Sequence, residues 1–247
     1  MTEEFYQALD LLSQNGSAEE IEEFLVRSLL RADKEKNYEA YAAAAEEMVR
    51  FYQMTGQFDK AEAASNDLLL LLEEMEQDDT EYFASVLVRH ANGYRDAGRY
   101  EEADRCYRRA GQILDRIQGG AESVGTLFSN MGMNHLAEGG FYEAEACFRE
   151  ANRAFESGEL FRNPYYASNM AGIAEALYRQ GSPAKALAQY EQLRDFIEKQ
   201  DGRGKSYALI CRNCAAVCDG MGDAATAAEY RAEAASVTDG MEGQSGL

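Results

Sequence analysis

The sequence has few residues that break helices and few that bind phosphate. Its 247 residues include only two prolines, and lysine and arginine together number 24 against 44 aspartates and glutamates. The scarcity of proline and a hydrophobic content of 46% indicate a folding sequence rather than a disordered one. The net charge of −20 repels the phosphates of nucleic acids and of anionic lipids. We therefore expect neither nucleic acid nor a membrane surface among the partners.

Long apolar segments are also missing. The longest leucine run is Leu68–Leu72, far short of the roughly 20 residues that span a bilayer. The N-terminus reads MTEEFYQALDLL, which is acidic where a secretory signal would be basic. Five cysteines, an odd number, lie within apolar helical patterns, which is typical of reduced thiols rather than of a disulfide framework. These features predict a cytoplasmic protein.

One pattern recurs five times along the chain. Each copy contains a glycine, and the spacings of 42, 41, 42 and 41 residues separate Gly56, Gly98, Gly139, Gly181 and Gly222. An alanine follows each glycine by five residues, at Ala61, Ala103, Ala144, Ala186 and Ala227. The positions four, seven and eleven residues before each glycine lie on one helical face and are mostly apolar. Each copy is therefore expected to be a helix, a tight glycine turn and a second helix.

This pattern resembles the tetratricopeptide repeat. In the copy around Gly98, the residues that match its consensus are Leu87, Ala91, Tyr94, Gly98, Tyr100, Ala103, Tyr107 and Ala110. The period is longer than the usual one of about 34 residues, and it is similar to the 41–42-residue period of kinesin light chain-type repeats. The resemblance implies an all-α solenoid, an α-α superhelix of about six helical hairpins. It also implies that the first helix of each hairpin lines a concave groove.

The expected hairpins form a single superhelical domain over residues 1–237. Their expected bounds are residues 3–35, 37–76, 80–117, 121–157, 164–199 and 204–237. The first hairpin is irregular, because Ile21 stands where the other copies have alanine. Asn163 and Pro164 form a helix-start signal, with asparagine as the N-cap. Residues 238–247 are rich in glycine and serine and are expected to be a disordered tail.

Three cysteines form the motif that most suggests chemistry. Cys211 and Cys214 have the CxxC spacing of zinc and redox sites, and Cys218 follows. However, all three occupy positions that other copies fill with apolar residues, and no second ligand pair lies at a suitable spacing. Packing as small hydrophobic side chains is the favoured interpretation. No catalytic set or phosphate-binding loop is found either, so we expect no enzymatic activity, no cofactor and no metal.

The inferred groove is the expected binding site. In the resembled family, peptide ligands touch first-helix residues that face away from the second helix. These positions carry five arginines and five acids in this sequence, so the groove is expected to be nearly neutral. Arginine can pair with carboxylates, and asparagine can bond an extended peptide backbone. The candidate partner-binding residues are Arg50, Arg89, Asn92, Arg95, Asn130, Met133, Tyr178, Arg179, Arg212 and Asn213.

Two of these asparagines allow one kind of partner to be rejected. Asn92 and Asn130 match the two asparagines of the carboxylate clamp by which some tetratricopeptide domains hold chaperone C-termini. The cation positions of that clamp fall on Val88, Ser168 and Gly172, so the clamp is incomplete. Our hypothesis is a scaffold that binds a peptide or helical segment of another protein in the concave groove. Two alternatives stay open: a peptide-sensing regulatory protein, and a structural protein that self-associates as a weak homo-oligomer.

Overall fold

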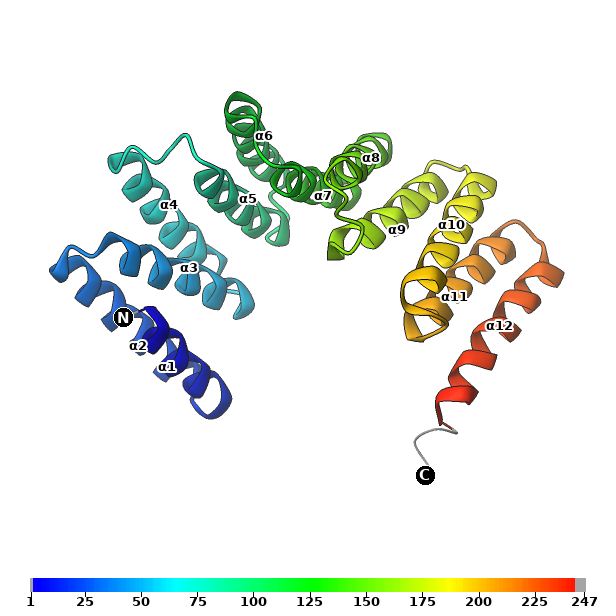
Figure 1. Ribbon diagram of the computed structural model, residues 1–247, viewed down its shortest axis with the longest axis horizontal. Coiled ribbons are helices and arrows are strands. Elements are labelled where there is room, and N and C mark those ends of the chain that lie inside the picture. Colours follow the sequence, from blue (N-terminus) through cyan, green and yellow to red (C-terminus); the bar gives the residue numbers. More distant parts are fainter. Residues whose placement is uncertain (1, 243–247) are drawn as a thin grey trace. The chain divides into compact units, whose positions relative to one another are not determined.

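Residues 2–242, which the computed structural model describes, form twelve α-helices and no strand (Figure 1). Side chains are described from residue 3 to residue 237. The helices follow one another as six hairpins, so the predicted all-α class and the number of hairpins are confirmed. The helices are α1 Thr2–Asn15, α2 Ala18–Glu35, α3 Tyr38–Met54, α4 Phe58–Glu74, α5 Glu81–Asp96, α6 Tyr100–Ile117, α7 Ala121–Glu138, α8 Phe141–Ser157, α9 Pro164–Arg179, α10 Pro183–Asp201, α11 Lys205–Gly220 and α12 Ala224–Glu242.

The hairpins belong to two compact units, Met1–Gln118 and Gly119–Leu247. The first unit contains α1 to α6 and the second contains α7 to α12. Within each unit every helix packs against the next one along the chain, and in the second unit α7 also contacts α9. The single continuous superhelix over residues 1–237 stays a prediction, and each unit is described by itself.

The turn of each regular hairpin requires glycine because of its backbone conformation. All five glycines of the repeated pattern have positive φ, between 71° at Gly56 and 96° at Gly139. This left-handed region disfavours side chains with a Cβ. Crowding is not the reason, because a Cβ added at Gly98 would have no neighbour within 4 Å. The recurrence of glycine therefore reflects the geometry of the turn.

The repeated alanine lies in the core of every regular hairpin. Ala103, Ala144, Ala186 and Ala227 are fully buried, and Ala61 is 3% exposed. Ala61 packs with Met48 and Tyr52 of α3, and Ala144 packs with residues of α9. A larger side chain at these positions would force the helices apart, at a cost of about 1–3 kcal/mol.

The second unit has an additional close contact around one phenylalanine. The ring of Phe148 on α8 lies between Gly132 of α7 and Gly172 of α9. A Cβ at Gly132 would come within 2.6 Å of this ring, and a Cβ at Gly172 within 2.5 Å. Gly172 is therefore a packing position, although its place in the sequence suggested the groove. The two glycines let α7 and α9 approach the ring closely.

Glutamates tie consecutive hairpins of the first unit together. Glu62 on α4 accepts hydrogen bonds from the Tyr94 hydroxyl at 2.7 Å and from Arg99 Nη1 at 2.5 Å. Glu22 on α2 accepts in the same way from the Tyr52 hydroxyl at 2.9 Å. Burial alone would raise the pKa of Glu62, but its hydrogen bonds to Tyr94 and Arg99 hold that pKa below the usual value. These carboxylates are therefore stabilised in their charged form.

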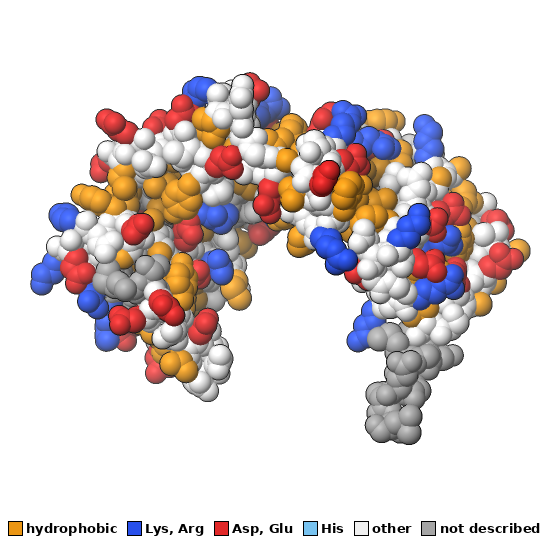
Figure 2. All heavy atoms as spheres, in the orientation of Figure 1, with side chains coloured by type: hydrophobic (Ala, Val, Ile, Leu, Met, Phe, Trp, Pro, Cys, Tyr) orange, Lys and Arg blue, Asp and Glu red, His pale blue; other side chains and the backbone are white. Residues whose placement is uncertain are grey.

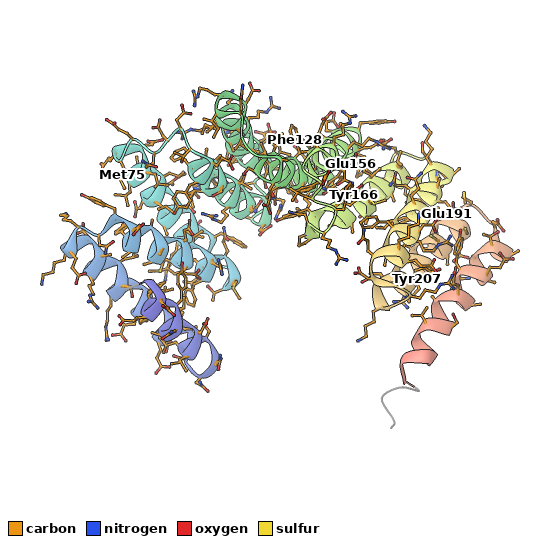
Figure 3. The ribbon with its side chains drawn as sticks, in the orientation of Figure 1. Met75, Phe128, Glu156, Tyr166, Glu191 and Tyr207 are labelled. Atoms are coloured by element: carbon orange, nitrogen blue, oxygen red, sulfur yellow. The ribbon has the colours of Figure 1, made fainter. Side chains whose placement is uncertain are left out.

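Tyrosine–glutamate pairs also occur in the second unit. The Tyr166 hydroxyl on α9 donates to Glu156 Oε1 on α8 at 2.8 Å (Figure 3). The Tyr207 hydroxyl on α11 donates to Glu233 Oε1 on α12 at 2.5 Å. The Tyr166–Glu156 pair joins two consecutive hairpins, and the Tyr207–Glu233 pair joins the two helices of one hairpin. In each pair a carboxylate accepts the hydrogen bond of a largely buried phenol. Hydrogen bonds to a charged acceptor are stronger than those between neutral groups.

The first hairpin is packed despite its irregular sequence. Ile21 is half-buried against a cluster that includes Leu9 of α1 and Leu25 of α2. Ser17 and Glu20 form a capping box at the start of α2, with the Ser17 amide donating to the Glu20 carboxylate at 2.7 Å.

The helix-start signal at Asn163 is confirmed, because its side chain accepts a hydrogen bond from the Tyr165 amide at 3.0 Å.

The tail prediction is wrong for part of its range. Helix α12 continues past Val237 to Glu242, so residues 238–242 are helical, while residues 243–247 lie outside the described residues. No helix among residues 2–242 combines the length and the apolar composition that crossing a bilayer requires.

Ala103→Leu should lower the free energy of unfolding by about 1–3 kcal/mol, because the added side chain overpacks a fully buried position. Urea unfolding followed by circular dichroism measures this change. Ala63→Leu, at an exposed position of α4, is the matched control and should be within about 0.5 kcal/mol of the wild type. Equal stability of both variants would contradict the close packing at the alanine positions.

Glu62→Gln should reduce the dependence of stability on pH in acid. A carboxyl group whose folded pKa is lowered stabilises the protein above its unfolded pKa, and this stabilisation is lost as the pH falls through the folded pKa. The variant should therefore be less stable than the wild type at neutral pH, and the difference should shrink below about pH 4. Urea unfolding at a series of pH values tests this, with exposed Glu101→Gln as the control. A constant difference at all pH values would rule out the stabilised carboxylate.

Candidate functional site

The first helices of the first unit share a surface that carries charged and aromatic side chains. We define the α3–α5 face by Tyr6, Glu46, Glu47, Arg50, Tyr82 and Arg89. Arg89 on α5 forms an ion pair with Glu46 on α3, and Arg50 pairs with Glu47 at 3.4 Å. Two arginines and two glutamates make this face neutral within a chain of net charge −20. That the whole predicted groove is nearly neutral stays a prediction.

Two tyrosines flank the charged pairs. Tyr6 is 39% exposed and Tyr82 is 40% exposed. Burial and a hydrogen bond to Glu46 raise the pKa of Tyr82. Burial and the charges of Glu47 and Glu46 raise the pKa of Tyr6. Both phenols are therefore protonated at neutral pH, and the Tyr82 hydroxyl donates a hydrogen bond to Glu46. Each of the two side chains places a polar hydroxyl beside an apolar ring.

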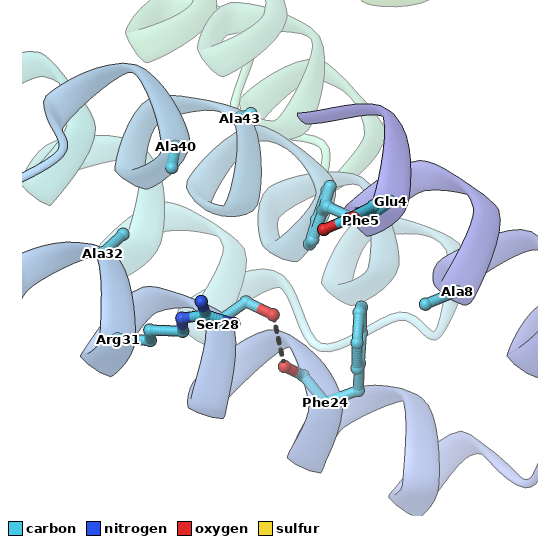
Figure 4. Close-up of a pocket in the computed structure, with 9 residues that line it drawn as sticks. All are labelled: Glu4, Phe5, Ala8, Phe24, Ser28, Arg31, Ala32, Ala40 and Ala43. Atoms are coloured by element: carbon cyan, nitrogen blue, oxygen red, sulfur yellow. Dashed lines mark hydrogen bonds between the residues drawn. The ribbon is translucent and has the colours of Figure 1, made fainter. Parts of the chain in front are cut away.

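An apolar pocket adjoins this face. Its volume is about 160 Å³, and its lining comes from α1, α2 and α3 (Figure 4). Phe5 and Phe24 stack with ring centroids 5.6 Å apart, and Ser28 Oγ donates to the Phe24 carbonyl at 2.9 Å. Of the nine residues in the lining, only Glu4 and Arg31 carry charge. A cavity of about 150 Å³ with apolar walls is large enough for a benzene ring, so this pocket has room for one apolar side chain.

The pocket and the face are continuous along two helices. Ala43 lines the pocket and lies one helical turn before Glu46 and Glu47 on the same side of α3. Phe5 lines the pocket and precedes Tyr6, with the two ring centroids 5.1 Å apart. An apolar side chain in the pocket would therefore place its neighbours against the charged and aromatic residues of the α3–α5 face.

Arg50 and Arg89 are the predicted residues that the structure brings to this face. Asn92 and Arg95 have different surroundings, farther along α5. Asn92 Oδ1 accepts from the buried Tyr107 hydroxyl at 2.6 Å and from Arg95 Nη1 at 3.3 Å, and Arg95 also pairs with Asp96 at 3.1 Å. Asn92 therefore ties α5 to α6.

Two of the predicted residues in the second unit belong to its packing. Asn130 is 2% exposed, and its side chain donates to the Thr126 carbonyl at 2.9 Å. Met133 is half-buried against the cluster that contains Phe148 and Ile173. The expectation that Asn130 bonds a bound peptide needs correction, because its amide is enclosed within the fold. We leave Asn130 out of the proposed site.

The other predicted residues of the second unit lie nearer its surface. Tyr178 is 41% exposed, and its hydroxyl lies 2.7 Å from the position of a Cβ built at Gly220, so it reaches α11. The Arg179 guanidinium lies 4.6 Å from the centre of the Phe141 ring. Arg212 on α11 is exposed and Asn213 is half-buried. Their role in binding stays a prediction.

The sequence reasoning missed Tyr6, Tyr82 and the pocket. Tyr82 lies N-terminal to the repeated positions of its copy, and Tyr6 lies in the irregular first hairpin. A signal for Tyr82 was nevertheless present. It precedes Arg89 by seven residues, which places both on the same side of a helix.

The three cysteines of the CxxC region are buried and free. Cys211, Cys214 and Cys218 are each 0% exposed within the core of α10 to α12. Burial raises the pKa of Cys211 to about 11 and that of Cys214 to about 12. Across the described residues, no group of three or more histidine, cysteine, aspartate and glutamate side chains could hold a metal ion. The cysteines therefore pack as apolar side chains.

The hairpins are similar to a known repeat family and to solved structures. Residues 82–157 match the family model described as tetratricopeptide repeat. BtubC (BKLC) from P. vanneervenii is similar in structure, with a TM-score of 0.79 at 20% identity, covering 92% of this chain and 93% of that one. The chain has the tetratricopeptide-repeat fold. A comparison with curated proteins finds no match.

Two further solved structures with this tetratricopeptide-repeat fold are informative. A putative kinesin light chain from Podosopora anserina with nearly identical TPR-like repeats has a TM-score of 0.70 at 16% identity, over 80% of this chain and 95% of that one. The predicted similarity to kinesin light chain-type repeats is thus confirmed at the level of the fold. A Rap protein complexed with Competence and Sporulation Factor has a TM-score of 0.52 at 13% identity, over 98% of this chain and 86% of that one.

The thiols of Cys211, Cys214 and Cys218 should not react with Ellman's reagent in the folded protein at about pH 8, because they are buried and their thiolates are scarce. They should react after unfolding in urea. Mass spectrometry of labelled peptides assigns the reacting thiols, with half-buried Cys147 as the internal comparison. Fast labelling of Cys214 in the folded protein would contradict the packing role.

Proposed function

We propose that this tetratricopeptide-repeat protein is a protein–protein interaction scaffold that binds a peptide or helical segment of a partner on the α3–α5 face. The observation that carries the proposal is the pair of half-exposed tyrosines around the Arg89–Glu46 ion pair, beside an apolar pocket. Tyrosine and arginine are the residues that most often dominate binding energy at protein interfaces. Proteins with this fold generally act as interaction scaffolds, and catalysis is not part of the proposal.

The arrangement suits a segment with one apolar anchor and polar neighbours. The anchor would enter the pocket of about 160 Å³ and bury its apolar surface against Phe5 and Phe24. The Tyr6 hydroxyl would donate a hydrogen bond to a carbonyl or carboxylate oxygen of the segment, and the Tyr82 oxygen, whose hydrogen is donated to Glu46, would accept one from an amide of the segment. Arg89 could exchange part of its pairing with Glu46 for a carboxylate of the partner. The complex of a Rap protein with its factor is consistent with such use of the fold.

In the second unit, taken by itself, Tyr178, Arg179, Arg212 and Asn213 remain candidate partner-binding residues. The large negative charge of the chain disfavours nucleic acid and anionic membranes as partners.

The cytoplasm is the proposed location, because all five cysteines carry free thiols, as in a reducing compartment.

Tyr82→Ala and Arg89→Ala should each weaken partner capture by about tenfold or more, because residues at the centre of an interface contribute about 2 kcal/mol or more. Affinity capture from the native lysate, quantified by mass spectrometry, compares the variants with the wild type. Ala43→Met, which narrows the pocket, should have the same effect on the same captured proteins.

Tyr142→Ala and Arg108→Ala are matched controls, since Tyr142 is 71% exposed and the Arg108 side chain is 70% exposed. Urea unfolding of every variant shows that the fold is retained. Capture that is unchanged by the Tyr82, Arg89 and Ala43 substitutions would overturn the proposal. Capture lost equally in the control variants would do the same.

A further inference from the structure

A second surface of the first unit is apolar and is formed by other helices. Val26 and Leu30 of α2, Tyr38 of α3 and Leu70 of α4 are between 40% and 66% exposed around a shared hollow of about 480 Å³. We call this hollow the α2–α4 groove. It shares no residue with the α3–α5 face or its pocket. In Figure 2, hydrophobic side chains are visible at the surface over α4.

The exposed leucines of this groove are not part of the hydrophobic core. Within the run Leu68–Leu72, Leu68, Leu69 and Leu72 are buried, whereas Leu70 is 57% exposed. Leu30 is 66% exposed near the end of α2. Scattered single leucines at a surface need no explanation, but several around one hollow indicate an interaction surface.

The rim of the groove is acidic. Asp33, Asp67 and Glu74 line it, and no lysine or arginine does. Asp33 pairs with Lys36 at 3.3 Å, but both of these side chains are more than 60% exposed. Asp33 of α2 and Asp67 of α4 line the same hollow as Tyr41 of α3, and burial together with these two charges raises the pKa of Tyr41. An apolar floor with an acidic rim selects a partner that is apolar and basic.

We propose that the α2–α4 groove binds an amphipathic helix of a partner protein, with two or three aliphatic side chains at i, i+4 spacing and lysine or arginine beside them. The charges exclude a second copy of this chain as the favoured occupant, because the two acidic rims would meet and repel each other. They also oppose an anionic lipid surface. The occupant is therefore a cationic protein segment.

The helical form of the occupant follows from backbone hydrogen bonding. The groove is bounded by helices, whose central amides and carbonyls are paired within each helix. An extended segment would find no sheet edge and would leave its own backbone groups unpaired over an apolar floor. A helix satisfies its own backbone and presents one apolar side to the groove.

A displayed library of peptides of about 16 residues, or roughly four helical turns, provides the probe. Selection on the wild-type chain should enrich sequences with aliphatic residues at i, i+4 spacing and flanking lysine or arginine. The double variant L30S/L70S should bind the enriched peptides about tenfold or more weakly by fluorescence anisotropy. The double variant D67N/E74Q should also bind them more weakly, and added salt should weaken the wild-type complex.

The control variant L11S/L209S removes two other leucines that are 64% and 51% exposed, and it should bind like the wild type. Circular dichroism verifies that all variants fold. Enriched peptides that bind L30S/L70S as well as the wild type would overturn the proposal, and so would enrichment of acidic or non-helical sequences. Sedimentation that shows a dimer of the chain, lost in L30S/L70S, would identify a second copy as the occupant and also overturn it.

Discussion

The close contact between helices at the repeated alanine is the constraint on which the rest of the structure depends. In each regular hairpin, a glycine with positive φ reverses the chain, and the alanine five residues later is buried in the packed helices. Because the alanine has almost no side chain, the neighbouring helices approach closely and their larger residues interlock around it. One hairpin cannot bury its apolar sides alone, so within each unit each hairpin stacks on the next. The fold is therefore a consequence of a contact that the chain repeats.

The stacking decides which surfaces remain available. Core residues occupy the sides of each helix that meet neighbours, and polar pairs such as Glu62 with Tyr94 tie the edges. What is left on α3 and α5 is a face where Arg89 and Glu46 pair with each other. What is left on α2 and α4 is a surface where Leu30 and Leu70 meet no core partner. The two remaining surfaces thus arise from the same packing, with different side chains.

Much of the fold could be predicted from the sequence, because the repeated positions report packing directly. The glycine and alanine positions indicated the turns and the buried contacts, and the apolar spacing indicated the helices. The prediction is weaker at the C-terminal end, because the expected last hairpin stops at Val237 whereas α12 continues to Glu242. The glycine and serine of residues 238–247 suggested a disordered tail, but residues 238–242 belong to α12.

The candidate site was predicted less well, for a physical reason. Assigning groove residues from their position in the repeat assumes that all first helices are equally exposed. In the second unit, the glycines at 132 and 172 admit the Phe148 ring, which draws α7 and α9 together. Asn130 on α7 is buried, although the corresponding position of the preceding hairpin, nine residues before Gly98, holds Arg89, whose side chain is 43% exposed. The spacing in the sequence indicates on which side of a helix a residue lies. The volume of the neighbouring side chains decides whether a ligand can reach that residue.

The chemical difference between the two surfaces of the first unit has a consequence for partner choice. The α3–α5 face is neutral, with donors from tyrosine and arginine, so it can accept a polar segment with one apolar anchor. The α2–α4 groove is apolar with carboxylates on its rim, so it disfavours acidic segments and attracts basic ones. The two surfaces share no lining residue, so a substitution in one leaves the lining of the other unchanged. A chain with both surfaces could therefore hold two chemically distinct partners on one unit, and the distance between those partners would be set by helices rather than by a linker.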